Sequence, residues 1–290
     1  MPHQSQPVDE TLYREDDFTF VKEECGIYDP DALKKHILAV QAKAYALHCF
    51  PCISMFSFAK TQMSTLPAYN EVLKLGRERE GAILLDLGCC CGTDIRKVAR
   101  DGFPVGNLLA SDILADFWDT GHELFRSTPK TFPVVFLPGD ALDPEFLEPS
   151  APLAAPMRVP DGGSPPPLTS LTCLTPLRGR VSVIHISAVL HLFSEDHQLH
   201  AVRSLAGLLS PLPGSIILGW HLGRRVKGFG LLGHASLDGR HVFCHSPDSW
   251  RALWEGVFPQ GTIKVEVELA EIASDDGEDW GRMTWSVVKI

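Results

Sequence analysis

The chain has 290 residues, of which 44% are hydrophobic, so it can bury a sizeable core in one globular α/β domain. Its formal charge of −10 and the lack of a long Lys and Arg run argue against nucleic acid as a partner. The first residues lack the basic start and apolar core of a secretory signal, and no apolar window suits a bilayer. We therefore expect a cytoplasmic protein with no membrane contact.

Two helices are predicted ahead of the first strong strand. The first covers 29–48, where Asp29 fits an N-cap position and apolar residues recur at helical spacing. The second covers about 63–75. Since both precede the alternating pattern of the core, residues 1–80 are expected to form an N-terminal helical cap or lid on a core that spans 81–290.

From residue 82 onward, short apolar runs alternate with helical segments, which is typical of a mostly parallel sheet. We therefore predict an α/β fold with a doubly wound, mostly parallel, seven-stranded sheet. The first five strands are expected at 82–88, 107–112, 132–140, 181–187 and 214–221. The helices of the core are expected at 92–102, 113–127, 195–210 and 246–258.

Two further segments complete the predicted core. Strands over 262–272 and 282–290, separated by an acidic stretch that contains glycine, predict a C-terminal antiparallel hairpin. Between the third and fourth strands, a Pro-rich segment at about 145–180 opposes both helix and strand. We expect this segment to be a surface insertion, in the form of a long and partly disordered loop.

Acidic residues end each of the first three predicted strands: Asp86, Asp112 and Asp140. Ligands of open parallel sheets bind beyond the carboxyl ends of the strands, where the strand order reverses. After Asp86 the chain turns through Gly88 and Gly92 into a helix, a geometry that presents backbone N–H groups to a ligand. In nucleotide-binding α/β folds, an acid that binds the ribose hydroxyls follows the glycine-containing loop at a characteristic sequence separation. Asp112 follows this loop at about that separation, so an adenosine-bearing ligand is expected.

The loop itself departs from common nucleotide motifs. It has no Gly-Lys-Ser/Thr, and Cys90 stands where a dinucleotide fingerprint would have its second glycine. Cys89, Cys90 and Cys91 have no second ligand pair at a zinc spacing, and the C-x-x-C of Cys49 and Cys52 encloses an apolar pair. We interpret these cysteines as small residues that fill space, and we expect no metal site.

Four stretches carry a family resemblance: LLDLGCCCGTDIRKVARDG, ASDILADFWDTGHELF, VIHISAVLHLF and HSPDSW. They resemble class I S-adenosylmethionine-dependent methyltransferases, and more narrowly the fungal small-molecule O-methyltransferases of meroterpenoid pathways. The resemblance to the general fold covers about 82–290, and residues 29–60 are similar to the narrower group. It implies a Rossmann-like methyltransferase core, S-adenosyl-L-methionine as cofactor and a small-molecule acceptor.

The resemblance also implies roles for individual residues. The loop would line the methionine part of the cofactor mainly through its backbone, Asp112 would bind the ribose, and Asp140 would accept from the adenine amino group. Ile186 and Ser187 would lie beneath the sulfonium. The implied cofactor-binding residues are Asp86, Gly88, Cys89, Gly92, Asp112, Ile113, Asp140, Ala141 and Ser187.

Histidine is the residue type that bears on the acceptor. A phenol is protonated at neutral pH and benefits from a nearby base, whereas a carboxylate is already ionised. His191, just past the fourth strand, is the leading catalytic candidate, either as a base or as a group that orients the acceptor; a buried structural histidine is the alternative. Weaker candidates are His221, His234 and His245.

The acceptor is expected to be a small, apolar secondary metabolite, methylated on oxygen, with a carboxylate favoured over a phenol or enol. N- or C-methylation and a nicotinamide-dependent oxidoreductase remain alternatives, and the oligomeric state is unknown. Small-molecule sites are mostly apolar and aromatic. Candidates for such a pocket wall are Tyr28, Tyr45, Phe56, Phe58, Trp220 and Phe229.

Overall fold

A seven-stranded sheet forms the centre of the molecule. The computed structural model describes residues 9–155, 166–231, 241–271 and 280–290. The strands lie in the order β3-β2-β1-β4-β5-β9-β8; β3, β2, β1, β4 and β5 are parallel to one another, and β9 is antiparallel to both of its neighbours, β5 and β8. Their bounds are β1 Ile83–Leu87, β2 Leu108–Asp112, β3 Val135–Pro138, β4 Val181–His185, β5 Ile216–Arg224, β8 Ile263–Glu271 and β9 Trp280–Lys289.

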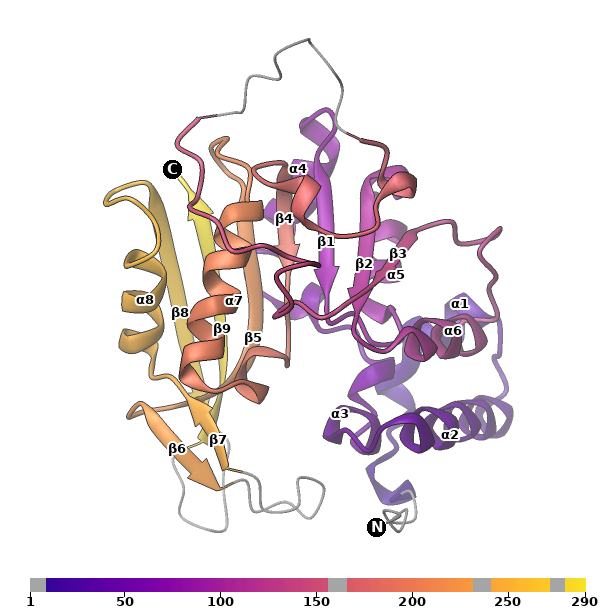
Figure 1. Cartoon of the computed structure of the whole chain (residues 1–290). Coiled ribbons are helices and arrows are strands. Elements are labelled where there is room, and N and C mark those ends of the chain that lie inside the picture. The colour runs from indigo at the N-terminus through magenta and orange to yellow at the C-terminus, as the bar shows by residue number, and fades with distance from the viewer. Residues whose placement is uncertain (1–8, 156–165, 232–240, 272–279) are drawn as a thin grey trace.

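This topology confirms the predicted fold class, including the closing antiparallel pair of strands. The acidic connection between β8 and β9 at 272–279 lies outside the described residues. The strand order reverses between β1 and β4, so the chain winds in both directions from that point. The carboxyl ends of the parallel strands lie together at the lower edge of the sheet in Figure 1.

Helices cover both faces of the sheet (Figure 1). Because both faces are covered, β1 is buried at every position, as in other parallel sheets. Leu84 packs on one side, in a cluster with residues of α4 and α5, while Leu85 packs on the other with residues of α7 and α8. The main helices are α1 Thr19–Cys25, α2 Pro30–Leu47, α3 Pro51–Ser54, α4 Tyr69–Glu78, α5 Thr93–Arg100, α6 Ala115–Leu124, α7 Glu195–Leu208 and α8 Pro247–Glu255.

Local capping explains where several of these helices begin. The Asp29 side chain accepts a hydrogen bond from Ala32 N at 2.8 Å and caps α2, as predicted. The predicted second helix starts late: residues Met63–Thr65 form only a 3₁₀ turn, η4, and α4 begins at Tyr69. Pro67 disfavours a helical conformation at Leu66, which is extended here.

The N-terminal helices have a hydrophobic cluster of their own. Phe18, Ile37 and Phe56 are fully buried in it together with Phe117 and Leu124 of α6. α2 lies against α6, beside the carboxyl edge of the sheet (Figure 1). In contrast, α4 packs with the sheet residues rather than with this N-terminal cluster.

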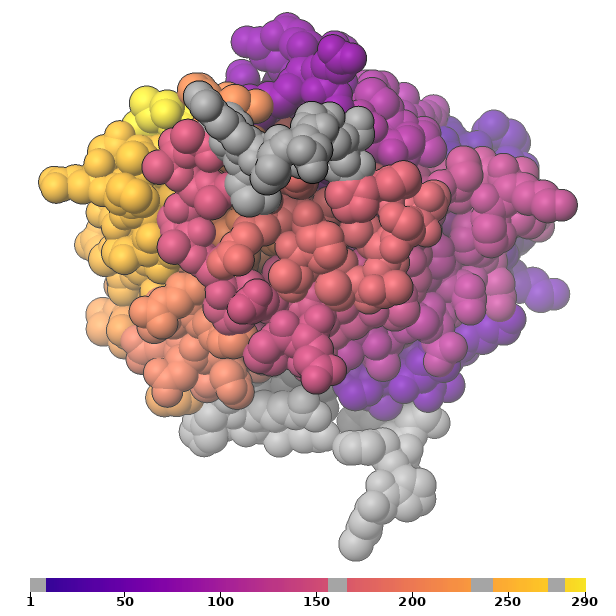
Figure 2. Space-filling model, turned by 45° about the horizontal axis from the view of Figure 1, so that its top comes forward, coloured from indigo at the N-terminus to yellow at the C-terminus, as the bar shows by residue number. Residues whose placement is uncertain are grey.

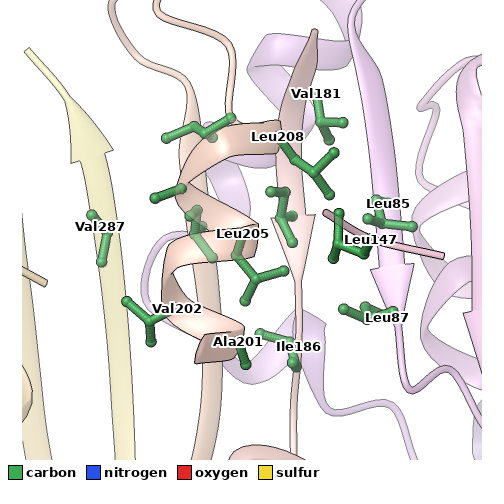
Figure 3. Packing of buried hydrophobic residues seen from close by; sticks show 14 of the residues in the cluster. Leu85, Leu87, Leu147, Val181, Ile186, Ala201, Val202, Leu205, Leu208 and Val287 are labelled. Carbon is green, nitrogen blue, oxygen red and sulfur yellow. The ribbon is translucent and has the colours of Figure 1, made fainter. Parts of the chain in front are cut away.

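The Pro-rich insertion is irregular in its described parts, as predicted, but some of its side chains are buried. Its described parts are irregular, with only the 3₁₀ turns η6 (Leu168–Ser170) and η7 (Thr175–Leu177), and they spread over one face of the molecule (Figure 2). Leu147, Leu174 and Leu177 are nevertheless buried in the core cluster. Leu147 lies beside Leu85 of β1 (Figure 3). Apolar burial therefore fixes this segment on the sheet in the place of a regular helix.

The strands that follow β4 also differ from expectation. β5 continues to Arg224, beyond its predicted end at residue 221, so His221 lies inside the strand and not at its end. A small sheet of β6 (Gly228–Leu231) and β7 (His241–Cys244), which the sequence did not indicate, follows β5 and flanks the carboxyl edge opposite the N-terminal helices (Figure 1).

The packing of the insertion gives a direct test. Leu177→Ala should lower the free energy of unfolding by about 2–5 kcal/mol, because it removes a fully buried side chain and leaves a cavity. Leu212→Ala, at a side chain that is 42% exposed, is the matched control and should stay within about 0.5 kcal/mol of wild type. Chemical denaturation measures both; equal effects would show that the insertion does not contribute to the core.

Candidate active site

The loop after β1 is held tightly at the carboxyl edge of the sheet. Gly88 and Gly92 have φ angles of +75° and +69°, which favour glycine. Gly88 N and Cys89 N both donate to Ser111 O of β2, at 2.8 and 3.1 Å. A Cβ on Gly88 would lie 2.4 Å from Val189 Cγ2, so this position has no space for a side chain. Gly92 N donates to Cys89 O at 2.8 Å and closes the turn that leads into α5.

Cys90 adopts the backbone conformation of the glycine that it replaces. Its φ is +49°, in the left-handed region that costs an L-residue about 1–2 kcal/mol. The Cys90 N–H donates to Asp112 Oδ2 at 2.8 Å, and this bond helps to hold the conformation. Cys89, Cys90 and Cys91 all keep free thiols, and burial raises the pKa of Cys89 well above its ordinary value.

Asp112 joins the ends of β1 and β2. Its second oxygen, Oδ1, accepts from Leu114 N at 3.1 Å, and the side chain is only 9% exposed. Burial raises the pKa of Asp112, although its backbone hydrogen bonds act in the opposite direction. Ile113, the next residue, is 59% exposed and presents an apolar surface at the edge of the sheet.

Asp140 lies one strand further along this edge and is exposed. Its Oδ1 accepts from Leu142 N at 2.9 Å, and the preceding Gly139 N donates to Asp112 O at 3.0 Å. Ala141 is half-buried beside it. The structure thus aligns Asp86, Asp112 and Asp140 at the ends of three adjacent strands, as their order in the sequence suggested.

A buried pair that the sequence analysis missed lies between β1 and β4. His185 Nδ1 is 2.7 Å from Asp86 Oδ1, and His185 Nε2 is 2.7 Å from Ser187 Oγ. Burial acts to lower the pKa of His185, but the Asp86 carboxylate and its hydrogen bond outweigh it, so the pKa is raised overall. Asp86 Oδ2 is buried and has no hydrogen-bond partner among the described residues.

Asp94, at the start of α5, connects this region to the N-terminal segment. Its Oδ1 accepts from Gln62 N and Met63 N, each at 2.7 Å. Burial raises the pKa of Asp94 to about 6, while the neighbouring His185 acts to lower it. This contact fixes the segment around η4 to the start of α5.

The three described candidate histidines are buried and neutral. His191 lies in the 3₁₀ turn η8 (Leu190–Leu192), and burial lowers its pKa to about 4. Burial also lowers the pKa of His245 to about 4 and that of His221 well below its ordinary value. His221 Nδ1 accepts from Trp285 Nε1 at 2.9 Å, which gives it a structural role. His234 lies outside the described residues.

The six aromatic candidates do not form one pocket wall. Tyr28 and Phe229 are 67% and 63% exposed, and Phe56 is buried in the N-terminal cluster against Phe18. The backbone N of Trp220 in β5 donates to Ser187 Oγ at 3.3 Å, while its ring packs against the sheet cluster that contains Leu84 and lies under Arg282. The described residues contain no group of three side chains suited to hold a metal ion, and none of their helices is both long and apolar enough to cross a bilayer.

Comparison with known proteins identifies the family. Residues 6–59 match the meroterpenoid methyltransferase N-terminal domain. The chain is 32% identical to methyltransferase trt5 of Aspergillus terreus, across 90% of this chain and 85% of the relative. The chain belongs to this family of fungal methyltransferases. It is also 28% identical to the O-methyltransferase phiE of a fungal species (strain ATCC 74256), across 89% of this chain and 75% of the relative.

A solved S-adenosylmethionine-dependent methyltransferase from Mesorhizobium loti aligns with 78% of the chain and 100% of its own, with 12% identity and a TM-score of 0.44. The cofactor of the present chain is S-adenosylmethionine. The residues at the carboxyl edge of its sheet fit this cofactor. The buried Asp86 Oδ2 lacks a hydrogen-bond partner among the described residues, and exposed Ile113 offers an apolar face to a flat base.

The role of Asp112 can be measured with the bound product. If Asp112 binds the ribose as the resemblance implies, Asp112→Asn should weaken the binding of S-adenosylhomocysteine by about one to two orders of magnitude, because the ribose hydroxyls then lose a charged acceptor. Calorimetric titration measures this loss, and circular dichroism checks the fold. Asp119→Asn, at an exposed position of α6, is the matched control and should bind like wild type; equal affinities of the two variants would contradict the assignment.

If the loop cysteines only fill space, substitutions at Cys90 and Gly88 should have different effects. Cys90→Gly should keep the affinity for S-adenosylhomocysteine within about threefold, because glycine adopts the same φ without strain. Gly88→Ala should lower the free energy of unfolding by about 1–3 kcal/mol and weaken binding, because its Cβ collides with Val189. Thermal unfolding and calorimetry compare them. Lost binding in Cys90→Gly alone would assign a function to the thiol.

Proposed function

We propose that the methyltransferase methylates an oxygen atom of a small, apolar secondary metabolite, and that a carboxylate is favoured over a phenol or enol. The observation that carries this proposal is the convergence of the loop after β1, Asp112 and the Asp86–His185–Ser187 group at one edge of the sheet. The relative phiE is named an O-methyltransferase, which supports oxygen as the methylated atom. The family match of residues 6–59 supports a meroterpenoid-like acceptor.

In this proposal each acidic residue binds a different part of the cofactor. Asp86 Oδ2 receives the ammonium of the methionine part, Asp112 the ribose hydroxyls, and Asp140 the adenine amino group. The backbone of the loop from Gly88 to Gly92 contacts the methionine part, and Ile113 and Ala141 contact the adenine. S-adenosylmethionine supplies a methyl group on a sulfonium, so the remaining task of the protein is to orient the acceptor and exclude water.

His191 is proposed to contact the acceptor. Since its pKa is about 4, its imidazole is neutral at physiological pH and can donate or accept a hydrogen bond. A carboxylate acceptor needs orientation but no base, so for such an acceptor His191 acts by positioning. The N-terminal part, 1–80, is proposed to cover the acceptor as a cap, and the cytosol is the proposed location.

Two measurements on the intact protein test the proposed function. Calorimetry should detect binding of S-adenosylmethionine and S-adenosylhomocysteine, and methyl transfer from labelled cofactor should be found with apolar acids in a panel of acids, phenols and amines. Absence of cofactor binding would overturn the proposal. Transfer to amines alone would assign a different methylated atom.

The kinetics of a His191 variant distinguish a role of this residue in acceptor binding from a role in the chemical step. With a carboxylate acceptor, His191→Ala should raise KM and leave kcat nearly unchanged; with a phenol it would depress kcat by about 10²–10⁴-fold. The effect on KM should be constant between about pH 6 and 8, because the pKa of His191 is about 4 and its charge does not change in this range. His197→Ala, at an exposed position of α7, is the control. Unchanged KM and kcat in His191→Ala would assign His191 a structural role.

A further inference from the structure

Three buried histidines come from elements that pack together. His191 belongs to η8, His221 to β5, and His245 directly follows β7; they are 8%, 1% and 2% exposed. η8 contacts both β5 and β7, and Arg224 N of β5 donates to His245 O at 3.0 Å. The rings of His221 and His245 both pack on Trp250, at 4.5 and 5.4 Å between centroids. These three imidazoles are called the histidine cluster below.

Each imidazole of the histidine cluster has one buried nitrogen without a hydrogen-bond partner among the described residues. These atoms are His191 Nδ1, His221 Nε2 and His245 Nε2. A buried polar atom that stays unpaired costs about 1–3 kcal/mol, and native proteins contain few of them. Three such atoms in one cluster therefore indicate that a hydrogen-bonding molecule binds between them.

A neighbouring indole fixes the position of the hydrogen on His221. Trp285 Nε1 can only donate, and it lies 2.9 Å from His221 Nδ1, so this nitrogen accepts. Burial keeps the imidazole neutral, because it lowers the pKa of His221 well below its ordinary value. A neutral imidazole that accepts at Nδ1 carries its hydrogen on Nε2. His221 Nε2–H is therefore a buried donor that needs an acceptor.

A serine hydroxyl fixes the hydrogen on His245 in a similar way. Ser249 Oγ accepts from Ser246 N at 2.9 Å and donates its hydrogen to Ser246 O at 3.1 Å. His245 Nδ1 lies 2.9 Å from the same oxygen, which can then only accept from it. His245 thus carries its hydrogen on Nδ1 and has a lone pair on Nε2. The unpartnered nitrogen of His245 is therefore an acceptor, whereas that of His221 is a donor.

We propose that one water molecule binds between the three nitrogens, and that His221 acts through this water to fix the tautomer of His191. Buried water typically makes about three hydrogen bonds to polar groups that would otherwise stay unpaired. This water accepts from His221 Nε2–H and donates its two hydrogens to His245 Nε2 and His191 Nδ1. Neutral His191 then carries its single hydrogen on Nε2, and every unpartnered nitrogen of the histidine cluster is satisfied.

The inference rests on the proposed function and specifies how His191 contacts the acceptor. Nδ1 is the buried nitrogen of His191, so Nε2 is the nitrogen that can reach a ligand. With its hydrogen on Nε2, His191 donates a hydrogen bond to an oxygen of the acceptor. It takes no proton from the acceptor, because its lone pair lies on Nδ1. His221 is a positioning residue that acts through His191.

Nitrogen NMR of histidine-labelled protein tests the proposed hydrogens without any activity. At pH 7, His191 and His221 should carry hydrogen only on Nε2, and His245 only on Nδ1. The resonances are assigned by their loss in His191→Gln, His221→Gln and His245→Gln. A wild-type His191 with hydrogen on Nδ1, or a His245 with hydrogen on Nε2, would refute the proposal.

Two variants of His221 test its effect on His191. His221→Phe removes the donor and should leave His191 as a mixture of both tautomers. His221→Gln offers an amide N–H near the position of Nε2, so it should keep most of the Nε2–H form of His191. An unchanged His191 signal in His221→Phe would show that the two residues are not coupled, which is contrary to the proposal.

Two buried indoles provide a matched pair of variants. Trp285→Phe removes the donor to His221 Nδ1 and should give mixed tautomers at His221 and His191. Trp254→Phe removes an indole N–H that is also buried but has no partner among the described residues, so the wild-type tautomers should persist. Circular dichroism checks the fold of both variants. Equal tautomer changes in the two would attribute the effect to lost packing and contradict the proposed hydrogen bonds.

Kinetics connect the tautomer to the reaction. With the acceptor that the panel of acids, phenols and amines identifies, His221→Phe should change the same kinetic parameter as His191→Ala, in the same direction, by about three- to tenfold. The double variant His191→Ala/His221→Phe should match His191→Ala, because His221 has no effect once the residue that it positions is gone. Additive losses would contradict this role of His221.

Cofactor titration of the same samples distinguishes the two proposals. Wild type and His221→Phe should bind S-adenosylhomocysteine with equal affinity, since the histidine cluster does not contact the cofactor in the proposed arrangement. Absence of binding in wild type would contradict the proposed function. Intact cofactor binding together with a His191 that carries hydrogen on Nδ1 would contradict only the present inference.

Discussion

The parallel pairing of β1 with β2 and β4 is the constraint on which the site depends. Parallel strands end at the same edge of the sheet, so residues far apart in the sequence meet there. This pairing brings Asp112 to Cys90 and sets Asp86 opposite His185, which lies 99 residues away. A slip of one residue would turn these side chains to the other face of the sheet.

Much of the fold could be predicted from the sequence because its core elements carry strong local signals. The strands are short apolar runs buried on both faces, and helix starts such as Asp29 and Ser246 have capping side chains. The insertion was only partly predictable. Its Pro content correctly excludes helix and strand, but it does not show which side chains of the segment are buried. Burial of Leu174 and Leu177 depends on the sheet beneath them and is not a property of the segment itself.

The site was only partly predictable for the same reason. Asp86, Asp112 and Asp140 end strands, and that position could be inferred from local pattern. His185 stands inside an apolar run, and only the register with β1 shows that it faces a carboxylate. The grouping of Tyr28 and Phe229 failed because composition does not show which aromatic side chains face solvent.

The carboxylate of Asp112 has a consequence for ligand capture. Before any nucleoside arrives, its two oxygens already accept from Cys90 N and Leu114 N, so the group is fixed in orientation. An ionised carboxylate has about four acceptor positions and therefore retains capacity for a diol. In the proposed binding of the ribose by Asp112, little side-chain entropy is lost on association, because the rotamer is settled in advance.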